Sequence, residues 1–182
     1  MIDKNNDIQQ RNIDLLIAGY WYEDLPPVID IANMKGMIKG IIEKIDNDID
    51  AHFSNSKKAL FLTGARQVGK TYSIRKYAKR HGLNLIEFNF LLQPETMDII
   101  NGAGDVKELL LRISAYSRIP LVQSRTLIFF DEVQECPDVM TWVKALVDEG
   151  SYIYALSGSL LGVELKDIRS VPVGYMSEMQ VY

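Results

Sequence analysis

Residues 64–71 read Gly64-Ala65-Arg66-Gln67-Val68-Gly69-Lys70-Thr71, which matches the pattern G-x-x-x-x-G-K-[ST] of phosphate-binding loops. Glycines at both ends let the backbone curl so that several N–H groups point at one anion. The lysine brings a positive charge to the outer phosphates of a triphosphate, and the threonine hydroxyl is a ligand for Mg²⁺. We therefore expect this phosphate loop to bind a nucleotide through all eight residues, with Lys70 taking part in catalysis and Thr71 in metal binding.

The segments on either side of the phosphate loop fit this interpretation. Residues 57–63 end in an apolar run that indicates a buried strand, and residues 71–80 have the pattern of a helix. Strand, loop and helix are the arrangement in which the motif binds phosphate, and the start of the helix adds its positive dipole end. The alternative, a glycine-rich turn before a surface helix, is disfavoured by the buried strand.

A second stretch with chemical potential is Thr126-Leu127-Ile128-Phe129-Phe130-Asp131-Glu132. Four consecutive apolar residues are typical of a strand buried on both faces, as in a parallel sheet. The two acids that follow, here called the acid pair, would lie in the ligand crevice at the carboxyl end of that strand. We expect Asp131 to serve the Mg²⁺ site and Glu132 to act as general base for the attacking water. A strand ending in a polar turn is the common alternative, and the phosphate loop upstream argues against it.

Serines follow another buried strand. Residues 152–156 indicate the strand, and Ser157-Gly158-Ser159 come directly after it. Hydroxyl groups there would sense the γ-phosphate or hold the attacking water. A serine-rich turn that caps the next short helix explains the same residues equally well.

The remaining pattern predicts a parallel, doubly wound α/β domain. We expect helices over 33–53, 71–80, 105–116 and 137–147, a loop over 94–104, and further strands over 85–90 and 174–182. Asp46, Asp48 and Asp50 are expected to form a solvated acidic face. The basic run 75–81 is expected to offset the negative end of its helix.

Composition excludes several classes of protein. The chain has 182 residues, a net charge of −4 and 47% apolar residues, which fits one domain with an additional arm. No apolar run approaches the roughly 18 residues of a membrane span, and the N-terminus does not resemble a signal peptide. Cys136 is the only cysteine, so a disulfide within the chain is excluded and a reducing cytoplasm is expected. The net charge gives no general attraction to nucleic acid, although nucleic-acid binding through a local patch stays open.

Three motifs together resemble a known family. They are G-A-R-Q-V-G-K-T at 64–71, F-F-D-E-V-Q-x-x-P at 129–137 and S-G-S-L-L-G at 157–162. The chain from about residue 57 to Tyr182 resembles the AAA-type P-loop ATPases of prokaryotes. The resemblance implies a P-loop NTPase three-layer sandwich with a mostly parallel five-stranded sheet, in which the acid strand and the serine strand are neighbours. It also implies ATP and Mg²⁺ as cofactors and places Gln134, Ser157 and Ser159 near the phosphates.

Two departures from the family pattern accompany this resemblance. Relatives continue into a C-terminal domain beyond the last strand, so we expect a lead-in segment over 1–56 and a C-terminally truncated ATPase core over 57–182. Many relatives have Gly-Arg where this chain has Gly174-Tyr175. Arg169, Arg118 and Arg125 are the nearest substitutes, and a surface position is favoured for each.

These observations leave two functions open. The first is Mg²⁺-dependent ATP hydrolysis that drives a conformational change in an attached domain, a protein partner or a homo-oligomer. The second is a nucleotide-binding module with little or no turnover. The chain has no N-K-x-D run for guanine, which favours adenine. A third hypothesis, a small-molecule kinase with the same loop, is disfavoured because the acid pair on a buried strand favours water as the acceptor.

Overall fold

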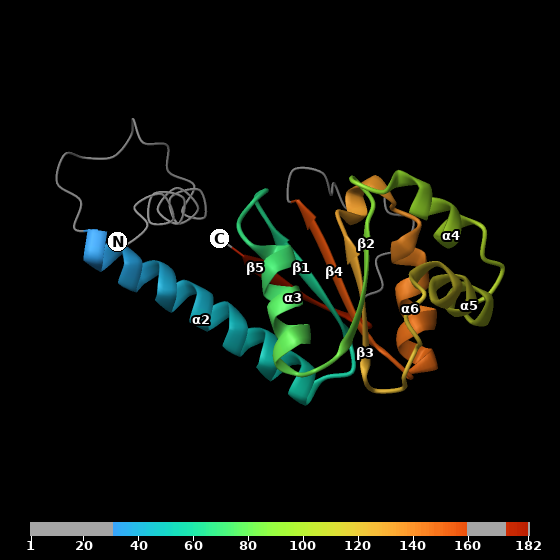
Figure 1. The fold of residues 1–182 in the computed structure, drawn as a ribbon, viewed down its shortest axis with the longest axis horizontal. Helices are drawn as coiled ribbons and strands as arrows, with labels where there is room; N and C mark the ends of the chain where they lie inside the picture. The colour runs from blue at the N-terminus through green and yellow to red at the C-terminus, as the bar shows by residue number, and fades with distance from the viewer. Residues whose placement is uncertain (1–30, 160–173, 182) are drawn as a thin grey trace, which may run out of the picture.

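A computed structural model describes residues 31–159 and 174–181, which form an α/β fold (Figure 1). Its strands are β1 (Ala59–Gly64), β2 (Asn84–Asn89), β3 (Thr126–Asp131), β4 (Ile153–Ser159) and β5 (Met176–Val181). Its helices are α2 (Ile31–Asn55), α3 (Lys70–Arg80), α4 (Met97–Asn101), α5 (Val106–Ser117) and α6 (Val139–Glu149), with 3₁₀ turns η2 (Pro94–Thr96) and η3 (Val133–Glu135).

The sheet is parallel throughout the described residues. Its five strands lie in the order β2-β3-β4-β1-β5, and each pair of neighbours runs in the same direction. The expected α/β class and five-stranded sheet are confirmed, and the sheet is entirely rather than mostly parallel. The acid strand β3 and the serine strand β4 are neighbours, as the resemblance implied. Because β4 also pairs with β1, it lies between the acid strand and the strand that leads into the phosphate loop.

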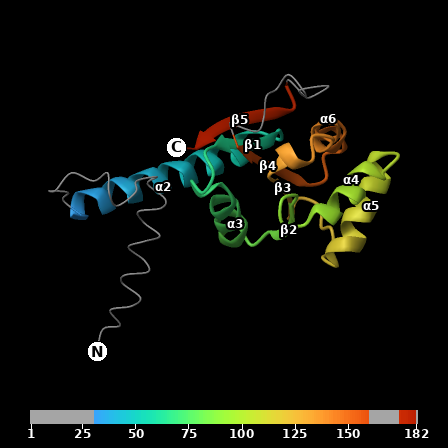
Figure 2. The same ribbon diagram turned by 90° about the horizontal axis from the view of Figure 1, so that it is seen from above.

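Helices cover both faces of the sheet, which makes the three layers that were expected (Figure 2). On one face, α2 and α3 pack on a core that includes Ile49, Ile74 and Leu62. On the other face, α4, α5 and α6 pack on a second core that includes Ile113 and Val143. Two cores of this kind require strands that are apolar on both sides.

Strand β3 shows this requirement most clearly, since all six of its residues are buried. Leu127 and Phe129 belong to the core under α2 and α3, while Ile128 and Phe130 belong to the core under α5 and α6. The alternation follows from the two-residue period of a strand. The polar end of β3 at Asp131 is therefore fixed in position by the apolar residues before it.

The start of α5 follows from its capping residues. The Asp105 side chain accepts a hydrogen bond from the Glu108 N–H (2.8 Å), and the Glu108 carboxylate accepts one from the Gly104 N–H (2.8 Å). This exchange satisfies backbone donors that the first turn of a helix leaves unpaired. The predicted helix start at residue 105 is confirmed to within one residue.

The region predicted as a loop over 94–104 contains the turn η2 and the short helix α4, so that prediction is wrong. Pro94 begins the turn, and the Thr96 hydroxyl donates to the Gln93 carbonyl (2.6 Å). Ile100 is fully buried in the core under α5. Burial of this side chain favours a helix in a segment whose glycines alone indicate a loop.

Helix α6 begins later than predicted. It starts at Val139 and not at Pro137, and the Pro137 carbonyl accepts from the Met140 N–H (3.1 Å) in a tight turn. Cys136, which precedes the proline, has an extended backbone with φ of −133°. The N–H groups of Val139 and Met140 bond to carbonyls three residues earlier, so residues 137–138 form a tight turn before the α-helix.

The structure excludes one of the two interpretations of the serines, and the role of their hydroxyl groups at the γ-phosphate stays a prediction. Strand β4 continues through Ser159, and Ser157 and Gly158 pair with Leu62 and Thr63 of β1. The alternative of a serine-rich turn is therefore wrong. Parallel pairing with β1 holds this end of β4 in the sheet, while the pairing of β4 with β3 ends at Leu156.

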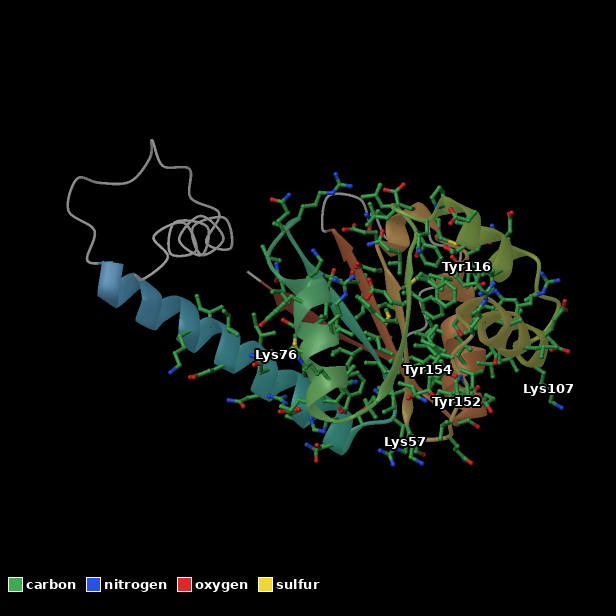
Figure 3. All side chains as sticks on the ribbon, in the orientation of Figure 1. Lys57, Lys76, Lys107, Tyr116, Tyr152 and Tyr154 are labelled. Carbon is green, nitrogen blue, oxygen red and sulfur yellow. The ribbon has the colours of Figure 1, made fainter. Side chains whose placement is uncertain are left out.

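Acidic residues that were expected to face solvent pair with basic residues that were expected to offset the negative end of their helix. Lys76 donates to Asp46, Arg80 donates to Asp50, and the His81 ring lies 2.8 Å from the second oxygen of Asp50. Figure 3 shows Lys76 on the side of α3 that faces α2. Each partly exposed pair contributes less than about 1 kcal/mol, and together they fix how the helix after the phosphate loop lies on α2.

Several predictions lie outside the described residues. These are the expected packing of residues 1–30, the position of Arg169, and residues 160–162 of the third family motif. The boundary between a lead-in segment and a core at residues 56 and 57 stays a prediction. The second half of α2 packs on the sheet, with Ile49 fully buried.

Candidate functional site

The phosphate loop, the acid pair and Ser157 lie at the carboxyl edge of the sheet. The loop follows β1, the acid pair ends β3, and Ser157 lies in β4 between those strands. Parallel strands bring their carboxyl ends to one edge, where open α/β sheets bind ligands. The sequence motifs that were separate along the chain are thus adjacent in the fold.

The backbone of the phosphate loop depends on its first glycine. Gly64 has φ of +147°, and a Cβ atom placed there would lie 2.1 Å from the Val181 carbonyl oxygen of β5. Such a distance is far inside van der Waals contact, so a larger residue would push β5 away. Gly64 is therefore required by the approach of the edge strand as well as by the turn.

Lys70 is buried, with 5% of its surface exposed. Its ammonium group donates to the backbone carbonyls of Gly64 (3.0 Å) and Ala65 (2.7 Å). Burial lowers the pKa of Lys70, and the negative charges of Glu132 and Asp131 partly oppose this shift. The ammonium is thus held at the loop by weak neutral acceptors that an anion would readily replace.

Asp131 is 1% exposed and accepts hydrogen bonds from three other elements. Its Oδ2 accepts from the Thr71 hydroxyl of α3 (2.8 Å) and from the Asn89 amide of β2 (2.9 Å). Its Oδ1 accepts from the Ser157 hydroxyl of β4. A buried carboxylate requires such partners, and here they join the phosphate loop to three strands.

Glu132 is half-buried at the end of β3. Its backbone is left-handed (φ 58°, ψ 49°), and its N–H lies 3.5 Å from the Ser157 hydroxyl. One oxygen of its carboxylate accepts from the Gln134 amide (2.5 Å). The left-handed residue ends the strand abruptly and directs the next turn back over the sheet edge.

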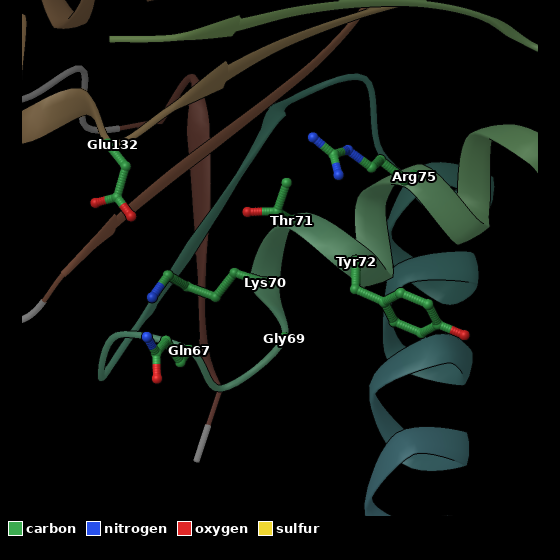
Figure 4. A pocket seen from close by; sticks show the side chains of 7 residues that line it. All are labelled: Gln67, Gly69, Lys70, Thr71, Tyr72, Arg75 and Glu132. Carbon is green, nitrogen blue, oxygen red and sulfur yellow. The ribbon is translucent and has the colours of Figure 1, made fainter. Parts of the chain in front are cut away.

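A pocket of about 300 Å³ opens between these groups. It is lined by Gln67, Gly69, Lys70, Thr71, Tyr72, Arg75 and Glu132. Figure 4 shows the side chains of Gln67, Lys70 and Glu132 pointing toward one space, while Tyr72 points away from it. The volume falls at the lower limit of small-molecule sites.

The structure separates the predicted site residues into groups. Four members of the phosphate loop line the pocket, and Gly64, Ala65, Arg66 and Val68 lie outside its lining. Asp131, Gln134 and Ser157 lie outside the lining as well; Gln134 donates to Glu132, and Ser157 donates to Asp131. Ser159 ends β4, where its backbone pairs with Gly64.

Sequence reasoning missed Asn89, Tyr72 and Arg75. Asn89 ends β2, and its amide is itself fixed because its oxygen accepts from the Leu92 N–H (2.9 Å). A polar residue at a strand's carboxyl end was an available signal for Asn89. Thr71 and Arg75 are four residues apart in a helix, so they lie on one side, which was the signal for Arg75.

The other arginines weighed as substitutes lie elsewhere. Arg118 follows the last residue of α5, and Arg125 precedes the first residue of β3. Both positions are near the amino end of β3, opposite the acid pair.

A family model described as an AAA domain matches residues 56–182, which is most of the chain. The match includes the phosphate loop, the acid pair and all five strands. A comparison with curated proteins found no match. Among the described helices, none has both the length and the apolar character needed to cross a membrane.

Proposed function

Because this chain belongs to the AAA domain family, whose function is nucleotide binding of the ATPase type, we propose that it binds ATP and hydrolyses it with Mg²⁺. The observation that carries the proposal is the hydrogen bond from the Thr71 hydroxyl to the Asp131 carboxylate. It joins the phosphate loop to the acid strand, as a site for a metal-bound triphosphate requires.

The oxygen atoms present fit Mg²⁺. Thr71 offers a hydroxyl and Asp131 a carboxylate, and Mg²⁺ prefers a few such oxygens together with water and substrate phosphates. We assign Thr71 and Asp131 to the metal. When bound, the ion would neutralise charge that develops on the outer phosphates.

The phosphate loop would hold the triphosphate through its N–H groups, and Lys70 would leave the carbonyls of Gly64 and Ala65 for the phosphates. Glu132 would take a proton from a water whose oxygen forms a bond to the γ-phosphorus. The bond from that phosphorus to the bridging oxygen breaks, and ADP and phosphate leave. Ser157 and Gln134 would act as positioning residues, because they contact Asp131 and Glu132.

We infer that hydrolysis drives a conformational change in an attached domain, a protein partner or a second copy. Loss of the γ-phosphate would remove contacts from the turn after β3, whose residues Glu132 and Gln134 lie beside the pocket.

The test of hydrolysis is Glu132→Gln. This variant should bind ATP like the wild type and release phosphate at least about 100-fold more slowly, because its amide accepts no proton. Glu135→Gln is the matched control, since Glu135 is exposed in the same turn. Equal phosphate release by both variants would refute the assignment of Glu132 as the base.

One contact favours the second candidate, a nucleotide-binding module with little turnover. The Gln134 amide occupies one oxygen of the Glu132 carboxylate. If this bond keeps the carboxylate from the water, Gln134→Ala should raise phosphate release several-fold. A fall in the rate would instead show that Gln134 positions the base for hydrolysis.

A further inference from the structure

Arg75 shares the pocket with Lys70 and Glu132. It lies one turn after Thr71 on α3, and Figure 4 shows its side chain extending toward the same side as the Thr71 hydroxyl. Of the residues that line the pocket, Lys70 and Arg75 are the cations. Their positive charges approach the ligand space from the phosphate loop and from the following helix.

Glu87 of β2 holds the Arg75 guanidinium in place. The Arg75 Nε donates to Glu87 Oε2 (2.8 Å), and Nη2 donates to Oε1 (2.6 Å). Two parallel bonds fix both the position and the plane of the group. Within the described residues, the Arg75 Nη1 makes no hydrogen bond, so one edge of the guanidinium is available to an acceptor.

This arrangement is more than is needed to attach α3 to β2. The Glu87 side chain is 18% exposed and the Arg75 side chain is 58% exposed. An ion pair that open to water contributes little to stability. The geometry of the Arg75–Glu87 pair instead resembles a preorganised phosphate-binding site. In such a site a fixed carboxylate holds one edge of the guanidinium, and the other edge faces the ligand.

We propose that Arg75 binds the terminal phosphate of the nucleotide and that Glu87 is the residue that positions it. The assignment to the terminal phosphate follows from the neighbours of Arg75 in the pocket, because Glu132 marks the end at which water attacks. This inference rests on the proposed function. It supplies from within the chain a positive charge at the transferred phosphoryl group.

The experiment compares two ligands on the whole chain in the presence of Mg²⁺. Binding of a non-hydrolysable ATP analogue and of ADP is measured by calorimetry for the wild type and for Arg75→Ala. The variant should lose at least about tenfold in affinity for the analogue and less than about threefold for ADP. Lys79→Ala, which removes an exposed cation from the same helix, should change neither affinity.

Two further variants separate ligand contact from a structural role. Arg75→Lys keeps the positive charge but lacks the planar guanidinium with its paired N–H donors. It should retain more of the preference for the analogue over ADP than Arg75→Ala does. Glu87→Gln leaves the arginine in place and should retain more of the preference than Arg75→Ala. If Arg75 only attached α3 to β2, Glu87→Gln and Arg75→Ala would have the same effect, and the inference would be overturned.

The outcomes also distinguish this inference from the function on which it rests. Equal affinity of the wild type for the two ligands, or equal losses in Arg75→Ala, overturns the role of Arg75 and leaves nucleotide binding intact. A wild type that binds neither ligand overturns both.

Discussion

Asp131 and Tyr154 are both buried polar residues on neighbouring strands, yet the two ends of the sheet treat them differently. At the carboxyl edge, Asp131 receives hydrogen bonds from three elements. At the amino edge, the Tyr154 hydroxyl is buried and makes no hydrogen bond to any described residue. Figure 3 labels Tyr154 near Tyr152 and Lys57, at the end of the sheet away from the phosphate loop. The difference teaches that the buried carboxylate of Asp131 is held by hydrogen bonds from neighbouring elements, whereas Tyr154 is held by the packing of its ring in the core.

The largest expected effect is on the rate of phosphate release, when the charge of the Asp131 carboxylate is removed. Asp131→Asn keeps the shape and an oxygen that accepts from Thr71 and Asn89, so the fold should survive. Loss of the negative charge should lower the rate of Mg²⁺-dependent phosphate release by about 100-fold or more, measured at saturating ATP and Mg²⁺. Ser157→Ala removes one donor and leaves the charge, and should cost about tenfold or less. A reversed order of these two variants would contradict the metal role of Asp131.

The next effect is on stability at the same edge. Gly64→Ala places a methyl group against the Val181 carbonyl and should destabilise the protein by about 2–4 kcal/mol in urea unfolding. Gly69→Ala has no atom within 4 Å of the new methyl group, and its φ of +94° alone should cost about 1–2 kcal/mol. Equal losses of stability in the two variants would mean that β5 moves to make room for the added methyl group.

Removing the Tyr154 hydroxyl at the amino edge should change the free energy of unfolding by a smaller amount and in the opposite direction. Tyr154→Phe keeps the ring in the core and deletes a polar atom without a partner, so it should stabilise the protein by about 1 kcal/mol. Tyr152→Phe, at a half-buried position in the same strand region, is the control and should change stability by less. Destabilisation by Tyr154→Phe would show that the hydroxyl is hydrogen-bonded in solution.

The smallest effect is a difference in alkaline stability. Burial raises the pKa of Tyr154 above its ordinary value of 10.0, with smaller contributions from the charges of Glu149 and Tyr152. The unfolded chain therefore loses this proton first, and the associated stability is present below pH 10 and falls as the pH rises above it. Unfolding followed between pH 9 and 11 should show a shallower alkaline loss for Tyr154→Phe than for the wild type. Parallel curves of stability against pH for the two proteins would refute the raised pKa of Tyr154.

The sequence was sufficient where the residues that cooperate are close along the chain. The phosphate loop could be predicted because its chemistry is contained in eight consecutive residues. Strand β3 could be predicted because a sheet covered on both faces demands a continuous apolar run. The capping of α5 by Asp105 and Glu108 is equally local.

The rest depends on which strands become neighbours. Asn89 contacts Asp131, and Glu87 holds Arg75, only because β2 pairs with β3 and lies beside α3. The pairing of Asp50 with Arg80 joins residues 30 positions apart. No periodicity within a single element reports such contacts. Short helices such as α4 are missed for a related reason, since burial of Ile100 in the tertiary structure outweighs the local glycines.

The contact between Gly64 and β5 has a mechanical consequence. Strand β5 is the sheet's edge strand beside β1, and its carbonyl oxygen at Val181 occupies the space that a side chain at residue 64 would need. A displacement of β5 along its axis would strain its parallel hydrogen bonds to β1 together and would press directly on the first turn of the phosphate loop. The close approach of Val181 to Gly64 thereby links the edge of the sheet to the first turn of the phosphate loop.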